Sequence, residues 1–328
     1  MTEQIIKLSP LVTPQAFYET NKELLGLVPD GTGMQIVFKI KGQNVVLAGP
    51  RGRSVMTVNG GTVENPAQPF VKQIVEEFEE ESFGVLKLIQ NSDNTLSLSL
   101  NGKIHALAVQ EDKSFVGGEV GKYMYVTFTA VCETATMEEL EQAAASMNPT
   151  AAFWNRIGNH LFSHLRSAPK DDTFSTYWAS KAKDRASLIE ELAKTDEETL
   201  LTKPTQVFGT KTIAEALAKL NEIDSHKAFM TMFKHTVGRF SERSGYYIFE
   251  TNELVNAVET GSKVVNDVNG VERATGIFND SAVKQVLPSF LTKKRSSAEL
   301  LNAVGVFGGS SSNSSVVVTQ TQEQQNTI

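Results

Sequence analysis

Five glutamates stand within six residues of the sequence, and they are the clearest chemical feature of the chain: Glu76, Glu77, Glu79, Glu80 and Glu81. Like charges three or four residues apart on a helix repel one another by roughly 0.2–0.5 kcal/mol per pair. A bound divalent cation would offset this repulsion, because Mg²⁺ takes carboxylate oxygens and fills its other positions with water or substrate phosphates. The stretch therefore predicts a metal site of the kind that handles phosphates.

The residues around the glutamates predict the elements that position them. The chain runs from the pair Gly60-Gly61 through a loop into a helix whose apolar positions are Val71, Ile74, Val75 and Phe78. At about 100° per residue, three glutamates lie on one flank of this apolar face, namely Glu77, Glu80 and Glu81, while Glu76 and Glu79 lie on the other. Glu77 and Glu81 are four residues apart, which is close enough to hold one cation together.

This order of strand, glycine pair, loop and glutamate-rich helix resembles the Nudix box. The sequence G-G-T-V-E from Gly60 to Glu64 is similar to the family's usual start, and V-V-L-A-G-P-R-G-R is placed like its preceding strand and arginine-bearing loop. The resemblance covers about residues 30–135. It implies a hydrolase that uses Mg²⁺ or Mn²⁺ and acts on a nucleoside diphosphate linked to another group, such as a nucleotide sugar, a dinucleotide or ADP-ribose.

The resemblance also implies roles for single residues. Its catalytic and metal-binding carboxylates would be Glu77, Glu80 and Glu81, with Glu64 as a further metal ligand. The substrate would be bound by Gly60, Gly61, Arg51 and Arg53. Guanidinium groups match phosphate oxygens, although the two arginines are equally well explained as solvated loop charges. The metal would activate a water molecule for attack on phosphorus, and the base would be one of the helix glutamates or a later carboxylate, Glu119 or Glu133.

The sequence departs from the box in four ways, and two of them, the missing arginine and the missing loop glutamate, favour an alternative function. Glu76 replaces the arginine that normally orients the glutamates, Gly84 comes one residue late, and the loop lacks its glutamate. The spacing from Gly61 to the helix motif is also one residue longer than in the box. Without that arginine, the carboxylates should depend on a metal for neutralisation. The alternative is a catalytically degenerate Nudix-like module that binds a nucleotide or a protein. A purely structural role, with the glutamates as a solvated face, is the third interpretation.

Composition narrows the class of protein. The chain has 328 residues and a net charge of −7, which argues against a generally basic nucleic-acid or membrane-surface binder. Its single cysteine, Cys132, excludes an intramolecular disulfide and is expected to be buried. The first residues lack the features of a signal peptide, and no apolar run reaches the roughly 18 residues of a membrane span, so we expect a cytoplasmic protein without a membrane partner.

The pattern along the chain predicts an α+β fold. Residues 1–30 form a lead-in with a helix that Thr13 caps and Pro14 opens, and residues 31–135 form a Nudix-like mixed sheet and helix sandwich with a hairpin at the turn K-G-Q-N. A helical domain covers 136–305 and offers a surface for a protein partner or a second copy, and 306–328 form a flexible tail. The first helix expected in the helical domain is M-E-E-L-E-Q-A-A-A-S-M-N, which ends before Pro149. The further helices expected in this domain cover about 151–167, 174–195, 211–238, 250–260, 280–291 and 297–304.

A second metal interpretation concerns His160 and His164. The two histidines lie four residues apart and could share a helix face, as two zinc ligands would. No glutamate between them completes the H-E-x-x-H motif, so we expect ordinary helix histidines.

Overall fold

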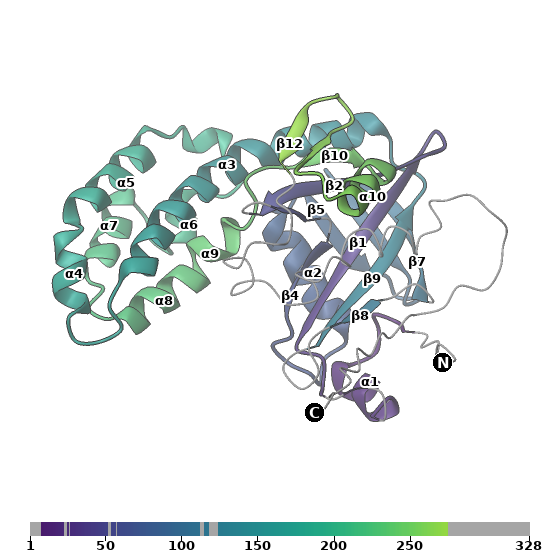
Figure 1. Cartoon of the computed structure of the whole chain (residues 1–328), viewed down its shortest axis with the longest axis horizontal. Coiled ribbons are helices and arrows are strands. Elements are labelled where there is room, and N and C mark those ends of the chain that lie inside the picture. Colours follow the sequence, from purple (N-terminus) through teal and green to yellow (C-terminus); the bar gives the residue numbers. More distant parts are fainter. Residues whose placement is uncertain are drawn as a thin grey trace, which may run out of the picture.

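The computed structural model describes residues 8–22, 25, 27–51, 54–56, 58–111, 115–117 and 124–274. Figure 1 shows a twisted sheet with helices around it, and beside it a group of helices formed by the middle of the chain. We call these the sheet region and the helical region. The α+β fold class is therefore confirmed. Arg53, Glu119, the helices expected after residue 275 and the expected tail lie outside the described residues.

The sheet has the strand order β10-β2-β1-β9-β7-β6-β5. Its strands are β1 (Gly31–Ile40), β2 (Gln43–Arg51), β3 (Ser54–Met56), β4 (Val58–Thr62), β5 (Leu86–Gln90), β6 (Leu96–Leu100), β7 (Lys103–Val109), β8 (Phe115–Gly117), β9 (Tyr125–Cys132) and β10 (Tyr247–Glu250). The central strands β1 and β9 are parallel, and the other pairs are antiparallel. Along β1, the first half pairs with β4 and the second half with β2, so the glycine pair lies beside the start of β1.

Two tight turns set the register of the hairpins. Lys41 and Gly42 join β1 to β2, and Asn101 and Gly102 join β6 to β7, all with positive φ. Two consecutive positive φ angles give the turn whose twist matches paired strands. The hairpin expected at K-G-Q-N is confirmed.

Alternate residues of the central strands enter two different hydrophobic cores. Met34, Ile36 and Phe38 pack toward α2 (Phe70–Glu81), whereas Val37 packs toward α10 (Thr251–Thr260). This alternation follows from the period of two in a strand, and burial on both faces explains why β1 and β9 are almost entirely buried. Cys132 is buried at the end of β9, as expected.

A 31-residue helix, α3 (Met137–Ser167), connects the two regions. Its first half packs in the core under the sheet, and its second half packs in a separate core with the other helices. The prediction that the helix ends before Pro149 was wrong, because α3 continues through this residue. A proline inside a helix costs about 3 kcal/mol, and the burial of α3 on both sides of Pro149 offsets that cost.

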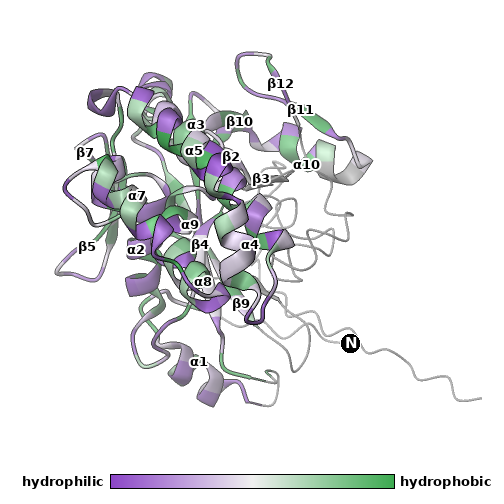
Figure 2. Cartoon of the chain, turned by 90° about the vertical axis from the view of Figure 1, so that its left-hand side faces the viewer, coloured by the Kyte–Doolittle hydropathy of each residue, from purple (hydrophilic) through white to green (hydrophobic). Residues whose placement is uncertain are grey.

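The helical region contains several shorter helices. They are α4 (Phe174–Ser180), α5 (Ala182–Lys194), η2 (Glu197–Thr199), α6 (Pro204–Val207), α7 (Ile213–Asn221), α8 (His226–His235) and α9 (Val237–Phe240). Figure 2 shows hydrophilic and hydrophobic residues alternating along α4, α5, α7 and α8. The prediction of continuous helices over 174–195 and 211–238 was wrong. Lys181 separates α4 from α5, and residues 222–225 separate α7 from α8. These breaks let the apolar faces of short helices surround Trp178 and Phe229.

The chain then returns to the sheet. Strand β10 pairs with β2 and forms the edge of the sheet on that side. Helix α10 covers the adjacent face, and a small hairpin of β11 (Val264–Asn266) and β12 (Glu272–Ala274) follows. At the other end, α1 (Pro14–Thr20) begins as expected, with the Thr13 side chain accepting a hydrogen bond from the Ala16 amide at 3.0 Å. Among the described residues, no helix has both the length and the apolar content to span a membrane.

Candidate functional site

The glutamate helix α2 is positioned by its apolar face. Phe70, Val71, Ile74 and Phe78 are buried against the sheet, as the helical period predicts. The helix ends where Phe83 and Gly84 adopt positive φ and the Gly84 amide donates to the Glu79 carbonyl at 2.8 Å. This end is a common way to satisfy the last carbonyls of a helix. The late position of Gly84 therefore lengthens the helix without disrupting its end.

The structure separates the five glutamates as the helical period predicts. Glu79 forms an ion pair with Lys87 at 2.9 Å on one side, and Glu76 is exposed at the rim of a pocket. Glu77, Glu80 and Glu81 lie on the opposite flank, beside the glycine pair and the chain that leaves the helical region. The three expected site glutamates are thus on one flank, although each has a different partner.

Glu77 packs against the glycine pair. Gln73 Nε2 donates to Glu77 Oε1 at 3.0 Å, and a Cβ at Gly61 would collide with the Glu77 carboxylate. At Gly60, a Cβ would collide with the backbone of Thr32 and Gly33 on the neighbouring strand. Close backbone packing therefore requires glycine at position 60, whereas at position 61 the flexible end of the Glu77 side chain would have to shift. The expected role of both glycines in substrate binding stays a prediction.

Glu80 is held by an arginine from the helical region. Arg239 Nε donates to Glu80 Oε2 at 2.7 Å, and Arg239 Nη2 forms an ion pair with Glu80 Oε1. This is a bidentate contact, which uses both carboxylate oxygens at once. The side chain of Arg239 is 46% exposed and that of Glu80 is 23% exposed. We call this contact the outer pair.

Glu81 is held by a second arginine, and this contact is closed off from solvent. Arg243 Nη2 lies 3.0 Å from Glu81 Oε2 and also donates to the Val58 carbonyl and Asn59 Oδ1, both at 2.7 Å. The two side chains are only 2% and 4% exposed. We call this contact the inner pair. A buried charge is costly unless it is paired and hydrogen-bonded. The three acceptors around Arg243 offset this cost and allow the guanidinium to be buried.

Tyr246 completes the surroundings of the inner pair. Its hydroxyl donates to the backbone carbonyl of Glu81, and the Arg243 guanidinium lies 5.6 Å from the centre of its ring. Burial alone would lower the pKa of Arg243, but the charge of Glu81 raises it above its usual value, and burial raises the pKa of Tyr246. Arg243 therefore stays charged and Tyr246 stays neutral at physiological pH.

Arg239 and Arg243 supply positive charge beside Glu80 and Glu81, so these two glutamates have charge partners in the absence of a metal. The expected Mg²⁺ or Mn²⁺ stays a prediction. Among the described residues, no group of three histidine, cysteine or acidic side chains is arranged to hold a metal ion. Both oxygens of Glu80 contact one guanidinium, so a metal could bind Glu80 only after Arg239 has moved away. No protein-family model, curated protein or solved structure matches this chain.

The other expected site residues are spread around the sheet. Arg51 is the last residue of β2 and lies opposite Ser54 of β3 in the sheet. Glu64 is exposed in the loop between β4 and α2. Glu133 pairs with Lys39 at 3.1 Å, and Lys39 lies about 20 Å along β1 from Gly33 at roughly 3.3 Å per residue. Glu133 is therefore too distant to act as a base beside the glycine pair.

A pocket of about 270 Å³ opens at the N-terminal end of α2. It is lined by Pro14, Val63, Glu64, Asn65, Gln68, Pro69, Phe70, Gln73 and Glu76. Its polar lining consists of carboxylates and side-chain amides, and none of these described residues is basic. The pocket is thus better suited to a hydrogen-bond donor or a cation than to a phosphate.

Proposed function

We propose that the chain is a Nudix-like protein that has lost metal-dependent hydrolysis and works as a binding module. The observation that carries this proposal is the pairing of Glu80 and Glu81 with Arg239 and Arg243. In the family pattern, an arginine of the helix itself orients the glutamates, but this helix has Glu76 there. Two arginines from the end of the helical region that lies next to α2, Arg239 of α9 and Arg243 just after it, take its place beside Glu80 and Glu81.

The pairing gives α2 a structural role that suits a binding module. It attaches the helix of the sheet region to α9 and to the loop that leads back into β10. A metal at Glu80 would have to displace Arg239, and a metal at Glu81 would have to leave the buried Arg243 with one partner fewer. Removing one member of a buried pair costs about 3–5 kcal/mol, so metal binding at Glu81 opposes the stability of the fold.

The pocket beside α2 supports a protein partner as the ligand. Two of its lining residues, Glu64 and Glu76, are carboxylates, and they would repel a diphosphate and attract an amine or a guanidinium. The amides of Asn65, Gln68 and Gln73 add hydrogen-bond acceptors and donors. A lysine or arginine side chain of a partner protein therefore fits this lining better than a nucleotide does.

Two titrations of the full chain test the choice of ligand. An arginine-containing peptide should bind, ADP-ribose should not, and Glu76→Gln should weaken peptide binding. Glu79→Gln is the matched control, because Glu79 is also an exposed carboxylate of α2 but pairs with Lys87 away from the pocket. Tighter binding of ADP-ribose, or equal effects of the two substitutions, would count against a protein partner.

A Mg²⁺-dependent hydrolase is the second candidate, and the exposure of the outer pair favours it. Arg239 is about half exposed, so it could leave Glu80 without disturbing a core. A metal held by Glu77 and Glu80 would polarise a diphosphate and activate water. Phosphate or nucleotide release from a panel of nucleoside diphosphate compounds, with and without Mg²⁺ or Mn²⁺, decides between the candidates. Turnover that needs the metal and is lost in Glu80→Gln would overturn the binding-module proposal.

A further inference from the structure

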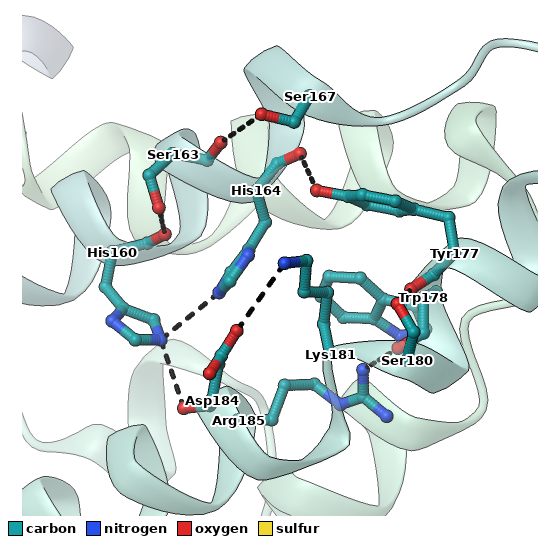
Figure 3. A network of polar contacts seen from close by, with 10 residues as sticks. All are labelled: His160, Ser163, His164, Ser167, Tyr177, Trp178, Ser180, Lys181, Asp184 and Arg185. Atoms are coloured by element: carbon teal, nitrogen blue, oxygen red, sulfur yellow. Dashed lines mark hydrogen bonds and ion pairs between the residues drawn. The ribbon is translucent and has the colours of Figure 1, made fainter.

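Two histidines of α3 face each other in the helical region, far along the chain from the glutamate helix. His160 and His164 lie one helical turn apart, and their Nε2 atoms are 3.4 Å from each other (Figure 3). His164 is 7% exposed, while His160 is half-buried and lies toward solvent. The two rings are nearly perpendicular, with centres 5.0 Å apart. Both ring nitrogens therefore point into one small space.

A third electron-rich atom lies at the same place. The backbone carbonyl of Asp184, in the first turn of α5, is 3.1 Å from His160 Nε2. If His160 carries its hydrogen on Nε2, it can donate that hydrogen to this carbonyl. When both histidines are neutral, Nε2 of His164 carries either a lone pair or a hydrogen, and this atom faces His160 Nε2. His160 Nε2 thus lies within 3.4 Å of two other electron-rich atoms, the ring nitrogen of His164 and the carbonyl oxygen of Asp184, and such a group of atoms attracts a cation.

The geometry matches that of a tetrahedral metal ion. Two imidazole nitrogens that each lie about 2.0–2.1 Å from zinc at a tetrahedral angle are about 3.3–3.4 Å apart. The separation of 3.4 Å between His160 Nε2 and His164 Nε2 has this value without any movement of the helix. We propose that His160 and His164 bind a divalent transition metal of the Zn²⁺ class, because imidazole suits Zn²⁺, Ni²⁺ and Cu²⁺ rather than Mg²⁺.

Asp184 and water complete the proposed site. No third side chain of the described residues is in place for a metal, but the Asp184 carboxylate belongs to the same residue as the nearby carbonyl. Its present partner is Lys181, at a loose 3.8 Å, and the Lys181 side chain is 35% exposed. Lys181 can therefore turn into solvent when a metal arrives. Arg185 does not compete for the site, because it is fixed by the Trp178 ring and by Asn221.

A metal at this position would connect α3 to α5. The two helices are joined near the site by the contact of His160 with Asp184, and Tyr177 on α4 donates to the His164 carbonyl at 2.8 Å. The ion would thus stabilise the helical region at its end away from the sheet. It would also be chemically separate from the glutamate helix, whose oxygen ligands prefer a hard cation.

A calorimetric titration of the metal-free full chain with Zn²⁺ tests the site. We expect one equivalent to bind, a Co²⁺ complex to show the intense visible absorption of tetrahedral coordination, and excess Mg²⁺ not to compete. His160→Ala should weaken binding by at least the roughly 10–100-fold that loss of a supporting group costs a metal site. His235→Ala, at the exposed end of α8, is the matched control and should bind as the unchanged protein does.

Asp184→Asn gives a further comparison and should weaken binding less than His160→Ala. The substitution at His160 is preferred to one at His164, because His164 is buried and its loss could unfold the region; circular dichroism of each variant checks the fold. The proposal is overturned if Zn²⁺ does not bind, if His160→Ala binds as tightly as the unchanged chain, or if the Co²⁺ spectrum is octahedral.

Discussion

The inner and outer pairs join the same two parts of the molecule, yet they lie in different environments. Glu81 and Arg243 are closed off from solvent, whereas Arg239 of the outer pair is about half exposed. An exposed pair contributes about 0–1 kcal/mol, but removal of one partner from a buried pair costs about 3–5 kcal/mol. The comparison indicates that the inner pair fixes the position of α2 and that the outer pair is the exchangeable contact.

The largest effect should come from breaking the inner pair. Arg243→Met leaves Glu81 buried without its guanidinium and removes the donor to Val58 and Asn59. We expect the free energy of unfolding, measured in urea, to fall by about 3–5 kcal/mol. The double variant with Glu81→Gln should recover part of this loss, because it removes the unpaired charge. A loss below about 1 kcal/mol for Arg243→Met would mean that the pair does not hold α2 in place.

The next effect tests how closely Glu77 packs beside these pairs. Gly61→Ala places a Cβ where the Glu77 carboxylate lies. Because the flexible Glu77 side chain can shift, we expect a loss of about 1–2 kcal/mol in the free energy of unfolding, in the lower part of the range for overpacking. Combining it with Glu77→Ala should restore most of the loss, because the colliding group is then absent. A double-mutant cycle measures this coupling. Additive effects of the two substitutions would show that the glycine is needed for another reason.

Some of this arrangement could be predicted from the sequence, because it depends on local periods. The buried face of α2, the flank shared by Glu77, Glu80 and Glu81, and the turn at Lys41-Gly42 all follow from spacing and turn chemistry. The fold class followed from the same patterns. The crowding of glutamates predicted a bound divalent cation, and that stays a prediction. In the structure, the positive groups beside Glu79, Glu80 and Glu81 are Lys87, Arg239 and Arg243.

The arginine partners could not be predicted, because they are distant in the sequence. Arg239 reaches Glu80 across 159 residues, and Arg243 reaches Glu81 across 162 residues. Their spacing of four in V-G-R-F-S-E-R was the only available signal, and it is too short to identify a partner. The passage of α3 through Pro149 was missed for a similar reason, since tertiary packing on both sides of the proline outweighs its local preference.

A smaller effect should follow from changing the ring beside the inner pair. Tyr246→Phe removes the hydroxyl that donates to the Glu81 carbonyl but keeps the ring near Arg243. Because a typical hydrogen bond contributes about 0.5–1.5 kcal/mol, we expect a loss of that size in the free energy of unfolding. Tyr18→Phe on α1 is the control and should change it less. Equal losses would mean that the contact with Glu81 is not important for stability.

The smallest effect on stability should come from the outer pair, and it separates stability from metal binding. Arg239→Ala should lower the free energy of unfolding by no more than about 1 kcal/mol, and added salt should reduce the difference, because salt screens exposed charges. The same substitution removes the guanidinium that contacts both oxygens of Glu80 beside Glu77.

Mn²⁺ binding, followed by electron paramagnetic resonance, should therefore be weak in the unchanged chain and stronger in Arg239→Ala. Adding Glu80→Gln to Arg239→Ala should abolish the gain, because an amide is a poorer ligand than a carboxylate for a hard cation. If Mn²⁺ binds equally well with and without Arg239, the arginine does not exclude the metal, and the hydrolase becomes the better interpretation of the site. If Mn²⁺ binds only when Arg239 is absent, the outer pair prevents metal binding at α2.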